Sequence, residues 1–194
     1  MATHREKSFI ATVSSEFGTL GHFRQLHAES LVDPFTRGTW AFTPSFAPHF
    51  LGHISEDRPV QPLQWYFRST DAGYVIYTRS EHFFGSYIGY GDGYFGAFST
   101  KAQSRSRFRF EPVVGEEGRH GVVIGEGDEV ITRLVSLDTG KPLCLREEHF
   151  KYRSLKSWQS KRCSYIAADG GEPLHLRLKI VQTHAPYLDN PDEV

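Results

Sequence analysis

Cysteine and asparagine are nearly absent from this chain of 194 residues. The only cysteines are Cys144 and Cys163, and no C-x-x-C or similar spacing suggests a metal site. We therefore expect two reduced thiols in strands and no disulfide framework. The single asparagine, Asn190, is followed by Pro191, so the chain has no N-glycosylation sequon, which is compatible with an intracellular protein.

Long apolar runs and an excess of one charge are also missing. No apolar run approaches the length of about 18 residues that a membrane-spanning helix needs, so we expect no membrane span. Residues 1–7 lack the apolar region of a secretory signal, and we therefore expect a cytoplasmic protein. The formal net charge is −1, which argues against a protein that holds nucleic acid by its overall charge.

Aromatic residues and glycine are abundant instead. The chain has 15 Phe, 9 Tyr and 3 Trp, so aromatic rings must fill much of the core. Its 18 glycines and 10 prolines interrupt helical periodicity, and short alternating runs bounded by turn residues dominate. The sequence predicts a single all-β domain over residues 1–183, followed by a C-terminal tail at 184–194.

The segment from Phe83 to Phe98 is the most informative part of the sequence. It consists of an aromatic run, a glycine-rich turn and a second aromatic run. Asp92-Gly93 lies between the two runs, and a tight primed turn needs the positive φ that glycine adopts without strain. This pattern predicts a β-hairpin.

An internal repeat divides the chain into three units, at about residues 9–44, 74–113 and 130–169. Each unit starts with a run of β-formers that ends on a serine, and these serines are Ser15, Ser80 and Ser136. Each closes with a short strand, and the expected closing strands are Thr39–Pro44, Arg107–Pro112 and Arg162–Ala167. Residues 45–73 and 114–129 are interpreted as insertions, of which the first includes a strand-like run, Trp65–Arg68. A final strand is expected over Leu174–Ile180.

The middle unit carries a motif that resembles the repeat of fascin-like and agglutinin-like β-trefoils. The motif combines Phe84-Gly85-x-x-Ile88-Gly89, Gly91-Asp92-Gly93, Gly96-Ala97 and Phe108-x-Phe110. The resemblance implies three four-stranded units around a pseudo-threefold axis, and likeness to fascin implies an actin-binding or other protein-binding module. A second interpretation starts from Gly38-Thr39-Trp40, which is similar to the first-strand signature of lipocalins. It predicts a calycin-like up-and-down β-barrel that binds a small molecule or acts as an enzyme.

The predicted hairpin supplies the candidate ligand-binding residues, which are Tyr87, Tyr90, Asp92 and Tyr94. Sugar rings present apolar C–H faces edged with hydroxyl groups. Tyrosine rings can stack on the faces, and a carboxylate can accept hydrogen bonds from the hydroxyls. We therefore expect a non-catalytic, lectin-like carbohydrate-binding module.

A second candidate surface is basic and consists of Lys101, Arg105, Arg107 and Arg109, around the closing strand of the middle unit. A local basic face can bind an acidic protein surface or an anionic glycan even when the whole chain is nearly neutral.

Signals for metal binding and catalysis are weak. His49 and His53 have the spacing H-x-x-x-H, but Pro48 and Gly52 disfavour the helix that would align their imidazoles. No Gly-x-Ser-x-Gly elbow and no phosphate-binding loop are present. We therefore predict no catalytic residues, no metal and no cofactor.

Overall fold

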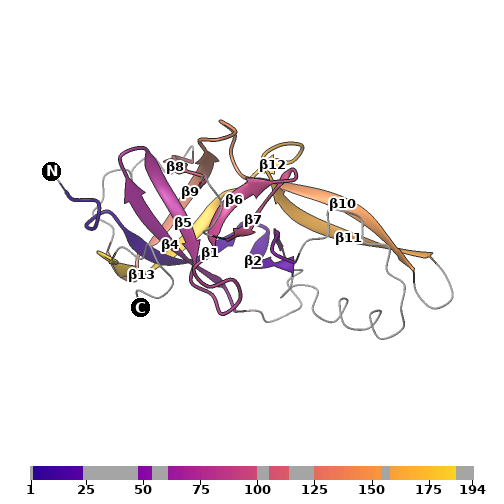
Figure 1. Ribbon diagram of the computed structural model, residues 1–194, viewed down its shortest axis with the longest axis horizontal. Helices are drawn as coiled ribbons and strands as arrows, with labels where there is room; N and C mark the ends of the chain where they lie inside the picture. The colour runs from indigo at the N-terminus through magenta and orange to yellow at the C-terminus, as the bar shows by residue number, and fades with distance from the viewer. Residues whose placement is uncertain are drawn as a thin grey trace.

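The computed structural model describes residues 2–23, 48–53, 61–99, 105–113, 125–153 and 158–186 (Figure 1). The elements in these ranges form one large, antiparallel β-structure, which confirms the all-β class. The strands are β1 (Phe9–Ser15), β2 (Gly18–His22), β3 (Leu51–His53), β4 (Leu63–Thr70), β5 (Gly73–Thr78), β6 (Tyr87–Gly91), β7 (Tyr94–Phe98), β8 (Phe108–Glu111), β9 (Glu129–Ser136), β10 (Cys144–Arg153), β11 (Trp158–Ala167), β12 (Glu172–Pro173) and β13 (Leu176–Thr183). No helix in the described ranges is long and apolar enough to cross a membrane.

Six of the strands pair in a closed cycle. β1 pairs with β4, β4 with β5, β5 with β8, β8 with β9, β9 with β13, and β13 returns to β1. Buried and less buried residues alternate along β1 and along most of β13, as expected for strands with only one face in the core. The buried faces enclose the main core, where Trp65, Phe67 and Phe108 have no exposed surface.

The register of this cycle repeats at three places. The three places are Trp65 of β4, Phe108 of β8 and Leu176 of β13, whose large side chains are fully buried. Each of these residues is paired with one residue on each of its two neighbouring strands. The opposing residues are Ala11 and Thr78 for Trp65, Tyr74 and Ser136 for Phe108, and Thr132 and Ser15 for Leu176. The residue equivalent to Ser15 and Ser136 is therefore Thr78. The sequence repeat had aligned Ser80 with them, two positions too far along the chain.

Three hairpins, β2–β3, β6–β7 and β10–β11, stand beside the cycle and pair with one another. Each carries an aromatic residue followed two positions later by glycine or alanine: Phe50 and Gly52, Tyr94 and Gly96, Tyr165 and Ala167. Each aromatic residue lies opposite the small residue of another hairpin: Phe50 opposite Gly96, Tyr94 opposite Ala167, and Tyr165 opposite Gly52. We call these six residues the hairpin junction.

Glycine at two positions of the hairpin junction permits a close approach of the strands. A Cβ atom on Gly52 would lie 2.5 Å from the carbonyl oxygen of Ser164, which precedes Tyr165. A Cβ atom on Gly96 would lie 2.8 Å from the carbonyl oxygen of His49, which precedes Phe50. Real Cβ atoms do not approach backbone oxygens so closely, so a larger residue would force the hairpins apart.

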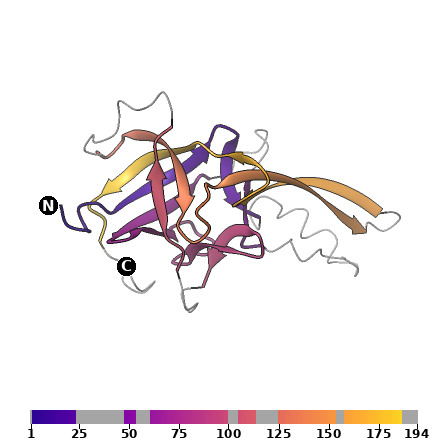
Figure 2. The same ribbon diagram turned by 90° about the horizontal axis from the view of Figure 1, so that it is seen from above.

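The hairpin predicted from the aromatic segment is confirmed as β6–β7. Its turn residues Asp92 and Gly93 have φ angles of 53° and 90°, as a primed turn requires. The longest hairpin is β10–β11, which extends away from the other strands as an arm (Figures 1 and 2).

The strand-like run Trp65–Arg68 and the expected final strand are confirmed as parts of β4 and β13. Arg162–Ala167, expected to close the third unit, lies instead within β11 and pairs with β10. β13 takes the closing position, because it pairs with both β9 and β1. The expected strand Thr39–Pro44 lies outside the described residues. At the start of the predicted tail, Ala185 is buried, and its N–H donates to the Ser8 carbonyl over 3.0 Å.

Replacing Gly52 with alanine tests the close approach at the hairpin junction. We expect Gly52→Ala to lower the free energy of unfolding by about 1–3 kcal/mol, because the new methyl group must push the Ser164 backbone away. Thermal and urea unfolding measure the loss. Gly125→Ala is the matched control, because its Cβ would approach only the Asp128 carboxylate, at 3.3 Å. Equal stability of the two variants would contradict the close approach.

Candidate functional site

The loop between β5 and β6, residues 79–86, is closed by backbone hydrogen bonds. The Thr78 N–H donates to the Ser86 carbonyl, and the Gly85 N–H donates to the Thr78 carbonyl, both over 2.9 Å. Phe83 and Gly85 have φ angles of 62° and 75°, in the left-handed region that bulky residues rarely occupy. The hydrogen bonds therefore hold this loop in one defined conformation.

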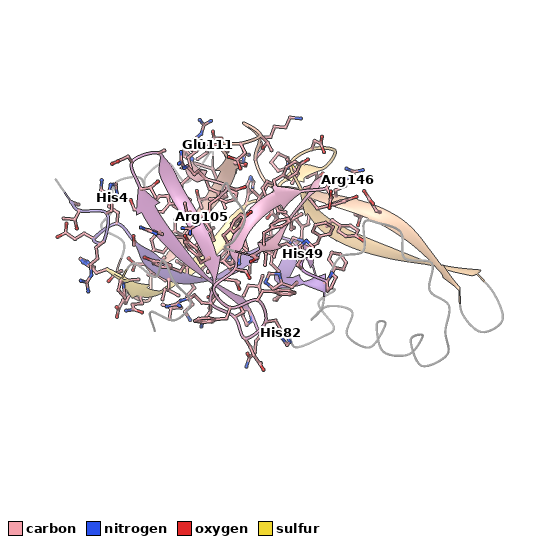
Figure 3. The ribbon with its side chains drawn as sticks, viewed as in Figure 1. His4, His49, His82, Arg105, Glu111 and Arg146 are labelled. Carbon is pink, nitrogen blue, oxygen red and sulfur yellow. The ribbon has the colours of Figure 1, made fainter. Side chains whose placement is uncertain are left out.

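This loop forms one wall of an open cleft of about 490 Å³. The other wall comes from the end of β7 and from His49, which precedes Phe50 of the first hairpin. The lining residues are His49, Phe83, Phe84, Gly85, Ser86, Ala97, Phe98 and Ser99. Phe84 is one of the most exposed large apolar residues in the described ranges, with 41% of its surface accessible. Figure 3 shows His49 close to the β6–β7 hairpin and His82 out on the loop.

Aromatic rings cover the glycines on the outer face of the hairpin. Tyr87 and Phe98 lie opposite one another, with ring centroids 5.9 Å apart. A Cβ atom on Gly89 would lie 2.6 Å from the Tyr87 ring, and one on Gly91 would lie 2.9 Å from the Phe98 ring. The rings therefore occupy the space above the glycines, and the Phe98 ring also lines the cleft.

His49 adds a titratable group to the cleft. Its imidazole lies edge-on to Phe98, with ring centroids 5.0 Å apart. Burial lowers the pKa of His49, and the negative charge of Asp92 partly opposes that shift. The imidazole is therefore neutral at pH 7, and a neutral imidazole offers one donor and one acceptor.

Two of the four predicted ligand-binding residues are buried. Tyr87 and Tyr94 each expose only 6% of their surface. The Tyr94 hydroxyl donates to the Glu148 carboxylate, which Arg146 also binds over 2.9 Å. Burial, together with the hydrogen bond to Glu148, raises the pKa of Tyr94 to about 12. Tyr94 therefore links the second hairpin to the third through its side chain.

The other two predicted residues, Tyr90 and Asp92, are exposed near the turn of the hairpin. Neither lines the cleft, which lies at the opposite end of the β6–β7 hairpin. Tyr90 packs on Phe95, with ring centroids 5.2 Å apart. The structure thus does not bring the four predicted residues together into one surface.

The predicted basic surface is divided by local contacts. Arg105 donates to the Tyr77 hydroxyl over 2.6 Å, and its guanidinium lies over the Tyr77 ring. Arg109 forms an ion pair with Glu111 at 2.8 Å. Arg107 is exposed, and Lys101 lies outside the described residues.

Two further histidines lie in the first hairpin, and of these His22 is buried and His53 is half-buried. His22 has no exposed surface, and its imidazole packs against Phe83 with ring centroids 4.9 Å apart. The Nε2 atom of His53 lies 2.6 Å from the Ser15 hydroxyl. Within the described ranges, no three His, Cys, Asp or Glu side chains are grouped so that they could hold a metal ion.

The aromatic residues of the cleft lie in the segment from Phe83 to Phe98 but are not among the predicted ligand-binding residues. The missed signal is the pair Phe83-Phe84 directly before Gly85. Two neighbouring rings in a turn favour exposure of one of them, but the local pattern does not specify which one. In the structure it is Phe84 that is exposed.

Comparison with protein-family models, curated proteins and solved structures finds no match to this chain. The functional proposal therefore rests on the geometry of the cleft.

Stability should fall as the pH decreases from about 6.5 to about 4. Burial lowers the pKa of both His22 and His53 to about 4, so in this range the unfolded chain binds protons that the native state excludes. Each histidine contributes a slope of up to about 1.4 kcal/mol per pH unit. Urea unfolding at pH 7, 6 and 5 measures the slope, which His22→Gln and His53→Gln should each reduce. An unchanged slope in both variants would contradict this assignment.

Proposed function

We propose that the chain is a β-trefoil and that it acts as a non-catalytic, lectin-like carbohydrate-binding module through the cleft at the base of the β6–β7 hairpin. The single observation that carries the function is the exposed Phe84 ring on a hydrogen-bonded loop, beside a neutral imidazole and two serines.

The pairings support the trefoil architecture. A trefoil has a six-stranded barrel and three hairpins that cap it, and the six-strand cycle and the hairpin junction match these two parts. The register also repeats three times, at Trp65, Phe108 and Leu176. In an up-and-down barrel of the calycin type each strand would pair with its sequence neighbours and the last strand with the first, whereas β1 also pairs with β4, and β5 pairs with β8. Large, fully buried side chains fill the space that a calycin would use for its ligand.

The chemistry of the cleft suits a sugar ring. Phe84 offers an apolar platform, and stacking of a ring's C–H face on it removes apolar surface from water. Ser86 and Ser99 supply hydroxyl groups, and neutral His49 can donate to one sugar hydroxyl and accept from another. The loop is already closed by its own backbone bonds, so binding requires little ordering of the protein.

A fascin-like module that binds actin or another acidic protein receives less support. Such binding would use the basic surface, but Arg105 and Arg109 are engaged with Tyr77 and Glu111. The charge of Arg109 is compensated by Glu111 and so adds little attraction for a distant acidic partner.

Replacing Phe84 with alanine tests the proposed platform. We expect Phe84→Ala to weaken binding of a sugar identified on a glycan array by at least about 10-fold, or ~1.4 kcal/mol. Titration calorimetry measures the change. Phe17→Ala is the matched control, because Phe17 is a similarly exposed phenylalanine (37%) that lies outside the cleft.

The unfolding temperature of both variants should stay close to that of the wild type. Binding that survives Phe84→Ala but is lost in a Tyr90→Ala, Asp92→Ala double variant would move the site to the turn of the hairpin. Absence of binding to every glycan on the array would refute the proposal.

A further inference from the structure

The loop that carries Phe84 also borders a second cavity, of about 320 Å³. This cavity is formed by β1, by β4 with the residues before it, and by the first half of the loop. Its lining is mostly polar and consists of Thr12, Gln61, Pro62, Gln64, Arg79, Ser80 and Glu81. The loop therefore has aromatic residues at the cleft and polar residues at the second cavity.

Arg79 connects the two cavities. It lines the polar cavity, and its guanidinium carbon lies 4.9 Å from the centroid of the Phe84 ring, which lines the cleft. The same guanidinium lies 5.8 Å from the centroid of the Tyr66 ring. Arg79 thus lines the polar cavity and stacks on a ring that lines the cleft.

The backbone around Arg79 is held in place. The Arg79 N–H donates to the Gln64 carbonyl over 2.7 Å, and the Gln64 N–H donates to the Ser80 hydroxyl over 3.0 Å. These bonds fasten the start of the loop to β4. The backbone from which the Arg79 side chain extends is therefore fixed relative to β4.

Arg79 forms no ion pair with any carboxylate of the described residues. Glu81 lines the same cavity but is exposed, and it forms no ion pair with Arg79. The neighbouring groups of Thr12, Gln64 and Ser80 are uncharged. Burial lowers the pKa of Arg79, yet a guanidinium keeps its charge at neutral pH. The half-buried Arg79 cation lies beside uncharged hydrogen-bonding groups, and the one carboxylate of the lining, Glu81, is exposed. This arrangement is suited to a planar anion such as a carboxylate.

We infer that the cleft and the polar cavity bind one acidic saccharide, such as a uronic-acid glycan, whose ring stacks on Phe84 and whose carboxylate is bound by Arg79. This inference rests on the proposed carbohydrate-binding function and specifies the class of sugar. The guanidinium presents two parallel N–H donors to the two carboxylate oxygens. A neutral sugar of the same shape would still stack on Phe84 but would leave Arg79 without an anion.

The test uses matched glycans that differ only in a glucose or a glucuronic acid residue. Affinities of the intact protein for both are measured by titration calorimetry at low and at physiological salt. The wild type should bind the glucuronic acid form at least 10-fold more tightly, and salt should reduce that preference. Arg79→Gln should remove the preference and leave the affinity for the glucose form within about 2-fold.

Arg107→Gln is the control, because Arg107 is an exposed arginine that lines neither cavity. It should leave both affinities unchanged. An unchanged preference in Arg79→Gln, or a wild type without any preference, overturns the acidic-saccharide inference but leaves the proposed function intact if Phe84→Ala still weakens binding. If neither glycan binds the wild type, the acidic-saccharide inference fails, and the proposed function fails only if no other glycan on the array binds. Thermal unfolding of Arg79→Gln confirms that the variant is folded before its affinities are compared.

Discussion

The close packing of an aromatic residue against a glycine or alanine, made three times at the hairpin junction, is the constraint on which the rest of the structure depends. Each aromatic residue lies opposite a small residue, because a larger side chain there would collide with the backbone carbonyl oxygen of the partner strand. The residues between the aromatic and small positions, Leu51, Phe95 and Ile166, are fully buried in the main core. The same three short segments therefore join the hairpins to one another and to the six-strand cycle.

The candidate site is built directly on this junction. His49 precedes the aromatic Phe50, and Ala97 follows the small Gly96. The Ala97 N–H donates to the His49 carbonyl over 2.9 Å, so the two residues face each other across the contact between the first and second hairpins. The cleft thus lies beside the contact between the first and second hairpins. Among the described residues, the rest of its lining comes from the end of β7 and from the loop between β5 and β6.

That loop combines two kinds of chemistry in eight residues. Its second half presents Phe83, Phe84 and Ser86 to the cleft, and its first half presents Arg79 and Ser80 to the polar cavity. The stack of Arg79 on Phe84 joins the two halves. An apolar platform beside a fixed cation is the arrangement that the proposals for a sugar, and for an acidic sugar in particular, depend on.

The sequence alone determined the all-β class, the β6–β7 hairpin and the starts of β1, β5 and β9, because strand alternation and turn chemistry are local properties. It also indicated a threefold repeat, in which Ser80 was aligned two positions too far along the chain. Arg162–Ala167, expected as a closing strand, lies in β11 and pairs with β10. Only the tertiary structure decided which aromatic residues are exposed. Tyr87 and Tyr94 are aromatic residues of the same glycine-rich segment as Phe84, but partners distant in the sequence bury them. Tyr87 packs in a cluster with Tyr66, and Tyr94 donates to Glu148. Exposure depends on such distant contacts, and no local pattern specifies them.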